Sequence, residues 1–195
     1  MKIIDIIKDS AMLLGLNQER AILENITAEN EIEMVAGNEN VASLFNLIKY
    51  SIRELCTSYV PVSTSVKKQS FENKIQLASL VNFIRIQNVY KNDEMVKFKI
   101  LNRNIVFEED GDYVVNYLTY PEIVSMFDEV DFLDNFSPDV IVLGLCAYYS
   151  LAHGMFDEFE DLHEKYVEKA ESLKSLKIFE IPCRRWEWEI KKLLK

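Results

Sequence analysis

Hydrophobic residues recur at three- and four-residue steps in two stretches of the first sixty residues. Residues 2–14 predict an amphipathic helix that Gly15 ends as a C-terminal cap. Residues 41–59 predict a longer helix, which Asn40 can cap and which Pro61 stops. Residues 17–40 between them are polar, with short helical pieces at 19–24 and 28–35. The two apolar stripes consist of Ile3, Ile7, Ala11 and Leu14, and of Val41, Leu44, Phe45, Ile48, Ile52, Leu55 and Tyr59.

The hydrophobic period changes to two between residues 62 and 118. Such alternation predicts strands with one face on a core and the other in solvent. Turns are expected at Lys91-Asn92-Asp93 and at Asp110-Gly111-Asp112. We therefore expect an antiparallel meander of about four or five short strands. The alternating apolar positions are Ile84 and Ile86, then Val96, Phe98 and Ile100, then Val115 and Tyr117.

The helical period returns after Tyr120-Pro121, where Pro121 fits the first turn of a helix. Ser137 is then expected to cap a helix over 138–152, with Pro138 in its first turn. This helix is nearly all apolar and rich in small residues, which indicates a central, buried position. A charged amphipathic helix is expected over 156–175, with an apolar stripe of Phe159, Leu162, Tyr166, Ala170 and Leu173.

This order of elements predicts an α+β fold, in which a helical bundle core carries an inserted antiparallel β meander or sandwich. The expected helical core domain comprises residues 1–61 and 119–181. The expected β insert domain comprises residues 62–118, and residues 182–195 form a C-terminal interaction tail.

Composition narrows the class of protein. No apolar run approaches the length of about 20 residues that a membrane span needs. Residues 1–10 do not read as a signal peptide, because Asp5 interrupts the apolar run. Cys56, Cys146 and Cys183 are too few and too widely spaced for a disulfide framework or a zinc site, so we expect reduced thiols.

The formal net charge of −10 is unevenly distributed. Between Arg103 and Lys165 there are fifteen acidic residues and no Lys or Arg. Such asymmetry affects association and repulsion between molecules rather than the fold. The plain interpretation is a solvated acidic face. The acids of the stretch are Glu108, Glu109, Asp110, Asp112, Glu122, Asp128, Glu129, Asp131, Asp134, Asp139, Asp157, Glu158, Glu160, Asp161 and Glu164.

Candidate chemistry is sparse, and the sequence predicts no catalytic, cofactor-binding or metal site. Glu160-x-x-His163 has the spacing that di-iron bundles use twice, but it occurs once. The run Glu108-Glu109-Asp110 lacks the spaced ligands of a calcium loop and is interpreted as a charged turn. The five glycines do not cluster, which excludes a phosphate-binding loop or a dinucleotide fingerprint.

The last residues are basic and aromatic, a composition that is typical of interface anchors. A tail that folds back and buries both tryptophans in its own domain is an equal alternative. Nucleic-acid binding is a third, disfavoured by the acidity of the chain. The candidate partner-binding residues are Arg184, Arg185, Trp186, Trp188, Ile190, Leu193 and Leu194.

The order of elements resembles the head-to-tail adaptor (connector) proteins of tailed bacteriophages. Residues 3–15 and 41–59 resemble the first two major helices of that family. Residues 105–118 followed by Tyr120-Pro121-Glu122 resemble its passage from the β region into the last helices. Residues 136–154, which end at His153-Gly154, and the acidic helix over 159–173 resemble its last two helices.

That resemblance implies a structural virion protein, without catalysis or cofactor, at the neck between head and tail. Copies would assemble in the host cytoplasm as a dodecameric ring under the portal protein, extend the DNA channel and form a platform for a tail or nozzle protein. Duplex DNA would pass without specific binding, and no membrane is involved. The tail would contact the portal. The expected channel-facing acids are Asp157, Glu158, Glu160, Asp161 and Glu164.

Two other classes of function remain open from the sequence. One is a soluble acidic binding module, such as a DNA mimic that inhibits a host nucleic-acid enzyme. The other is a small helical metalloenzyme, which would contain iron or manganese.

Overall fold

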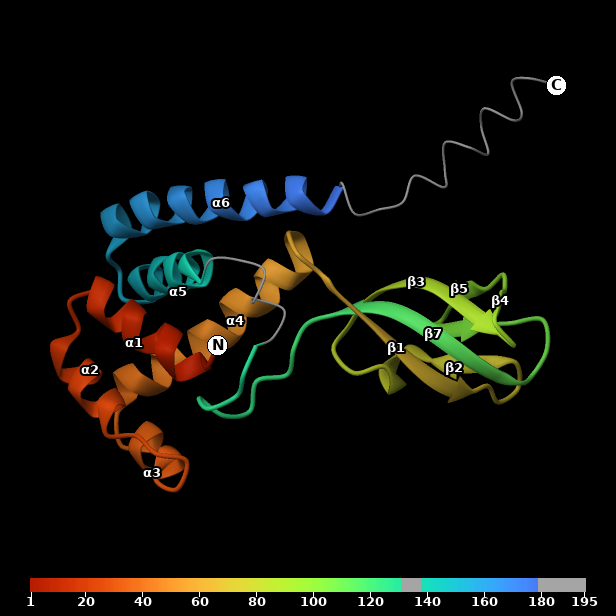
Figure 1. Ribbon diagram of the computed structural model, residues 1–195, viewed down its shortest axis with the longest axis horizontal. Coiled ribbons are helices and arrows are strands. Elements are labelled where there is room, and N and C mark those ends of the chain that lie inside the picture. The colour runs from red at the N-terminus through yellow and green to blue at the C-terminus, as the bar shows by residue number, and fades with distance from the viewer. Residues whose placement is uncertain (131–137, 179–195) are drawn as a thin grey trace, which may run out of the picture.

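The computed structural model describes residues 1–130 and 138–178, and this part of the chain confirms the α+β fold. Helices and strands separate into a helical lobe and a β lobe that lie side by side along the longest axis (Figure 1). The helices are α1 (Ile3–Leu13), α2 (Asn17–Glu24), α3 (Glu31–Ala36), α4 (Glu39–Ser58), α5 (Asp139–Ala152) and α6 (Phe156–Ile178). The strands are β1 (Val62–Gln69), β2 (Lys74–Gln76), β3 (Phe83–Lys91), β4 (Glu94–Met95), β5 (Lys99–Leu101), β6 (Asn104–Val106) and β7 (Asp112–Thr119), with a 3-10 turn η1 (Leu77–Ser79).

The helical lobe packs around α4 and α5, whose apolar residues form one core with those of α1 and α6. The predicted stripe of α4 is buried from Val41 to Leu55, and Ile3, Ile7 and Ala11 of α1 are fully buried. Helix α6 was expected to end at residue 175, and its last turn instead extends to Ile178. Among the described residues, no helix is long and apolar enough to cross a membrane.

Two glycines end helices as the sequence predicted. Gly15 has φ +70°, and its N–H donates to the Met12 carbonyl at 3.2 Å while Leu16 N–H donates to Ala11 at 2.8 Å. Gly154 has φ +73° and repeats the pattern after α5. This left-handed cap satisfies helix carbonyls at a backbone angle that favours glycine.

The cap of α4 differs from the prediction. Asn38, not Asn40, accepts a hydrogen bond through its side chain, from Val41 N–H at 2.9 Å. Asn40 lies within the first turn and donates instead to Glu19 Oε1 of α2 at 2.7 Å. Both asparagines precede the apolar stripe. The side chain of Asn40 is bound to Glu19, so Asn38 is the residue that caps the helix. The helix therefore starts at Glu39, two residues before its stripe.

We expect Asn38→Ala to lower the free energy of unfolding by about 1 kcal/mol, since an N-terminal donor of α4 loses its partner. Asn38→Asp should retain stability, because the carboxylate accepts the same bond and favours the helix N-terminus. Chemical denaturation measures both. Equal stability of Asn38→Ala and the unsubstituted protein would contradict this capping role.

The β lobe contains two small antiparallel sheets that share a core, which is the sandwich alternative of the predicted insert rather than a single meander. Their strand orders are β1-β7-β3-β4 and β2-β6-β5. Central β7 pairs along its length with β1 and with β3, and the two sheets share a second core around Val89, Ile105 and Val115. The predicted turn at Asn92 and Asp93 joins β3 to β4, both residues having positive φ.

The expected alternation fails at the β4–β5 connection. Val96 and Phe98 are partly buried, but Ile100 is 52% exposed and lies on the edge strand β5. Pairing between β5 and β6 extends over three residues only, so a period-two pattern could not show that Ile100 lies on an exposed edge strand.

The helix expected at Pro121 is absent: residues 121–130 form turns and a short bridge between Lys2 and Glu129. Side-chain carboxylates, one of them distant in sequence, accept bonds from the backbone N–H groups there. The Glu31 carboxylate accepts from Met126 N–H at 2.7 Å, and Asp128 accepts from Val124 N–H at 2.7 Å. Met126 is fully buried beside α1. The expected cap Ser137 lies outside the described residues, and Pro138 precedes the first residue of α5 rather than occupying its first turn.

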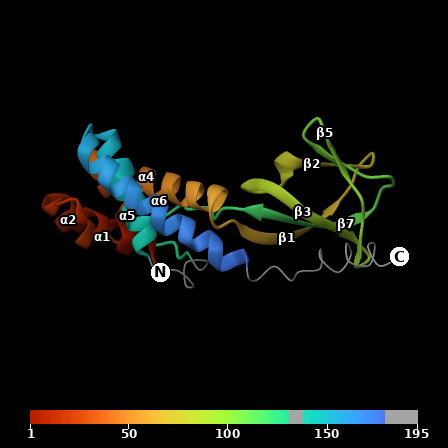
Figure 2. The same cartoon turned by 90° about the horizontal axis from the view of Figure 1, so that it is seen from above.

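The chain crosses between the lobes twice, before β1 and after β7. At this junction Thr119 Oγ1 donates toward the carbonyl oxygen of Asn82 at 3.0 Å, and Asn82 Nδ2 donates to Tyr120 O at 3.2 Å. The Arg53 guanidinium of α4 lies 5.2 Å from the centre of the Tyr120 ring. The view in Figure 2 shows α6 lying over the helical lobe and extending toward the β lobe.

Candidate functional site

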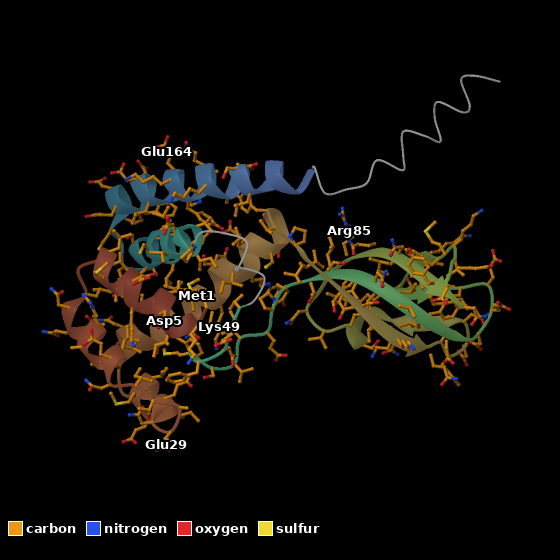
Figure 3. All side chains as sticks on the ribbon, viewed as in Figure 1. Met1, Asp5, Glu29, Lys49, Arg85 and Glu164 are labelled. Carbon is orange, nitrogen blue, oxygen red and sulfur yellow. The ribbon has the colours of Figure 1, made fainter. Side chains whose placement is uncertain are left out.

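The outward face of α6 is the most distinctive charged surface of the described chain. All five acids expected there are exposed: Asp157, Glu158, Glu160, Asp161 and Glu164. Asp157, Glu160, Asp161 and Glu164 follow one another at the three- and four-residue steps of one helix face, opposite the buried stripe, and Glu158 lies on the flank between the two faces. The buried stripe consists of Tyr166, Ala170 and Leu173. Figure 3 shows Glu164 on the side of α6 away from the helical lobe.

These acids are not neutralised by ion pairs with other described residues. Further along α6, Lys169 pairs with Asp139 of α5 at 3.2 Å, and Lys174 pairs with Glu171 of α6 itself at 2.9 Å. Lys165 is exposed four residues after Asp161 and forms no ion pair with another described residue. Like charges four residues apart, as in Asp157/Asp161 and Glu160/Glu164, each destabilise a helix by about 0.2–0.5 kcal/mol. Only the first-turn acids benefit from the helix dipole. Stability alone does not account for the whole row.

A polar cluster beneath α6 fixes its position. Glu54 of α4 accepts two phenolic hydrogen bonds, from Tyr148 of α5 at 2.5 Å and from Tyr166 of α6 at 2.8 Å. Burial, followed by the hydrogen bond to this carboxylate, raises the pKa of both tyrosines well above the ordinary value. One carboxylate thereby joins three helices and orients the acidic face outward.

We expect the free energy of unfolding to fall as pH rises above about 10, because the unfolded tyrosines then lose protons that Tyr148 and Tyr166 keep in the fold. This stabilising difference is fully present below pH 10. Replacing both by Phe should make the decline above pH 10 shallower. Denaturant titrations between pH 8 and 11 test this, and unchanged slopes in the double variant would contradict the linkage.

Close packing at Gly144 brings the three helices together, as the small residues of α5 predicted. A Cβ at this position would meet Ser51 Oγ of α4 and would lie 3.0 Å from Cε2 of Tyr166 on α6. Cys146, on the same helix, is buried, and its thiol donates to the Ser10 carbonyl of α1 at 3.6 Å. Burial raises the pKa of this thiol to about 12, so it stays protonated at neutral pH.

The other candidates of the sequence form contacts within the fold. His163 packs among aromatic rings at tilted and edge-to-face angles, its ring centre 5.0 Å from that of Phe159. No group of three metal-ligating side chains occurs in the described part of the chain. At the acidic turn, Asp110 accepts from Ser70 Oγ at 2.8 Å, and Glu109 pairs with Lys91 at 2.7 Å. These bonds close the loop before β7.

Other expected residues were not placed, and some contributors were missed. The partner-binding candidates Arg184, Arg185, Trp186, Trp188, Ile190, Leu193 and Leu194, together with Cys183, lie outside the described residues. Sequence reasoning overlooked Glu54, because its position beside an apolar stripe resembles that of any solvated acid. The two tyrosines it joins were interpreted as apolar packing alone.

No protein-family model matches the sequence, and no curated protein matches it.

Proposed function

We propose that this chain is a ring-forming structural adaptor, which extends a DNA channel between a portal protein and a tail in a virion neck. The observation that carries the proposal is the outward face of α6, where five exposed carboxylates form a row without ion-pair partners among the described residues. The resemblance in element order to phage adaptors supplies the assembly context.

The acidic row suits a wall along which DNA slides. Duplex DNA carries about one negative charge per 1.7 Å of its axis, and cations that neutralise phosphates hold it in place. A row of carboxylates does the opposite, since it repels phosphates. Asp157, Glu160 and Glu164 lie on one side of a helix whose other side is anchored by Tyr166.

Assembly into a ring would let this row of acids repel DNA from all sides of the channel. One helix presents a narrow stripe, but rotational symmetry around a bore repeats it once per copy and lines the whole wall. Closed rings form when a heterologous interface repeats around an axis. The portal would template this symmetry, and the opposite side of the ring would receive the tail.

A second function is favoured by the same row of carboxylates. Acids held at fixed spacing on a rigid helix can imitate the phosphates of DNA, so an acidic binding module could occupy the DNA site of a basic enzyme. Such a module would act as a monomer or dimer and would compete with DNA.

Mass measurement separates the two proposals. We would mix the purified chain with the portal protein of the same genome and determine the masses by native mass spectrometry. The adaptor proposal predicts a complex with one copy of the chain per portal subunit. Binding of one or two copies, or no binding, would contradict it, whereas displacement of DNA from a basic enzyme would support the DNA mimic.

A further inference from the structure

A crevice of about 340 Å³ opens where the two lobes meet. Helix α4 forms one wall, and the other consists of Asn82, just before β3, and of the segment that follows β7. Sites for small ligands begin at about 300 Å³ and lie preferentially between domains. Figure 3 shows Lys49 of α4 beside the segment that follows β7. The polar and aromatic lining consists of Lys49, Tyr50, Arg53, Asn82, Tyr120 and Glu122.

Two positive charges enter this crevice from α4. Lys49 and Arg53 lie one helical turn apart, and neither forms an ion pair with another described residue. Like charges at this spacing destabilise a helix. The chain carries 32 Asp and Glu against 22 Lys and Arg, so it has acids in excess with which these two cations could have paired. Neither helix stability nor the charge balance of the chain therefore explains this pair of free cations.

Aromatic rings fix the positions of both cations. Lys49 Nζ lies 3.8 Å from the centre of the Phe45 ring, and the Arg53 guanidinium lies 5.2 Å from the centre of the Tyr120 ring. Contacts of this kind orient a cation without neutralising its charge. A guanidinium can bind two oxygens of one phosphate, and an ammonium adds further donors. The pair is therefore suited to a dianionic phosphate.

The remaining lining suits a flat ring with polar edges. Tyr50 is 54% exposed, and its ring meets that of Tyr148 at an interplanar angle of 87°, so it is not stacked on another described ring. A free aromatic face stacks readily on a base. Asn82 Nδ2 donates to Tyr120 O at 3.2 Å, but Asn82 Oδ1 accepts no bond from another described residue. This oxygen can accept a hydrogen bond from a ring N–H.

Among the described residues, Glu122 is the single carboxylate that lines this crevice. It is exposed and forms no ion pair with Lys49 or Arg53. Its charge opposes a bound anion, so it lowers the affinity of the site for phosphate. The two cations still leave the lining with a net positive charge, in a protein whose formal net charge is −10.

We propose that this crevice binds an aromatic phosphate monoester of the size of a nucleoside monophosphate. Lys49 and Arg53 bind the phosphate oxygens. The base stacks on Tyr50 and donates a hydrogen bond to Asn82 Oδ1. The ligand contacts α4 on one side and, through Asn82, the β lobe on the other, so its binding stiffens the junction between the lobes. This inference is independent of ring assembly and of the acidic face of α6.

Isothermal titration calorimetry of the full chain with thymidine 5′-monophosphate tests the proposal. Lys49→Gln/Arg53→Gln should abolish binding. Tyr50→Leu should weaken binding of the nucleotide by about ten-fold, because stacking on the base is lost, and should leave the affinity for inorganic phosphate unchanged. The control Lys67→Gln/Arg85→Gln removes the same charges from exposed positions of the β lobe outside the crevice and should bind the nucleotide as tightly as the unsubstituted chain.

Two smaller probes separate the parts of the site. Inorganic phosphate and thymidine should each bind about ten-fold or more weakly than the nucleotide, because each makes only part of the contacts. Glu122→Gln should tighten binding of the nucleotide several-fold, since a like charge is removed. No binding at millimolar nucleotide, an equal loss of affinity in the control, or phosphate that binds as tightly as the nucleotide would overturn the proposal. The last of these results would make the crevice a plain anion site.

Discussion

Replacing Gly144 by Leu should lower the free energy of unfolding by about 3 kcal/mol, since it forces a large side chain into a closely packed helix contact. Even the first added atom would meet Ser51 of α4 and the ring of Tyr166 on α6. The helices would have to move apart, which would also stretch the bonds of Tyr148 and Tyr166 to Glu54. For a chain of 195 residues this corresponds to a fall in melting temperature of about 6–12 °C.

Ala152→Leu provides the matched control, because it introduces the same side chain at an exposed position at the end of α5. Its melting temperature should remain near that of the unsubstituted protein. Thermal denaturation followed by circular dichroism measures both variants. If Gly144→Leu were as stable as Ala152→Leu, the close approach of α4, α5 and α6 would not be the basis of the helical lobe.

Replacing Asp157, Asp161 and Glu164 by Lys should convert the acidic face into a surface that holds DNA. The substitutions change three exposed positions on one side of α6, and a ring would repeat that change in every copy. We expect the assembled portal complex to bind duplex DNA at least ten-fold more tightly than the unsubstituted complex. The new affinity should fall steeply with salt, because phosphate contacts release counterions. Fluorescence anisotropy of a labelled duplex, measured over a salt series, checks this.

The matched control reverses three exposed acids away from α6, Glu29, Glu33 and Glu94. It changes the net charge by the same amount, so it separates the position of the acids from the overall charge of the protein. This variant should gain far less affinity for DNA. Equal gains in the two variants would mean that the row on α6 has no special relation to the path of the DNA.

Helix periodicity was predictable wherever one face of a segment meets one core. The apolar stripe of α4 and the small residues of α5 identified the central helices. Gly15 and Gly154 marked the ends of α1 and α5. These signals could be recognised because they depend only on residues that are close together in the sequence. The prediction that Asn40 caps α4 was wrong, because Asn38 caps it instead. Asn40 binds Glu19, and this contact depends on how α2 folds back against α4, which the local sequence does not show.

Features that depend on distant contacts could not be predicted. Residues 121–130 contain Pro121 and apolar residues at helical spacing, yet Glu31 of α3 binds Met126 N–H and favours a turn. Strands β5 and β6 pair over three residues only, which is too few for a hydrophobic period to show which strands belong to which sheet. Glu54 joins Tyr148 and Tyr166 across three helices, and spacing along one helix cannot show this.

The acidic face was the part of the candidate site that the sequence described best. Exposure of Asp157, Glu160, Asp161 and Glu164 followed from their position opposite the apolar stripe of α6, and Glu158 is exposed on its flank. What they face in an assembly depends on the partner, so their relation to a channel remains our proposal.

Electron cryomicroscopy of the chain bound to the portal protein of the same genome tests the central claim most directly. The account predicts a closed ring on the portal, with α6 of every copy on the inner wall and Asp157, Asp161 and Glu164 directed into the bore. A ring with α6 on its outer surface, or a portal that binds no ring of this chain, would contradict it.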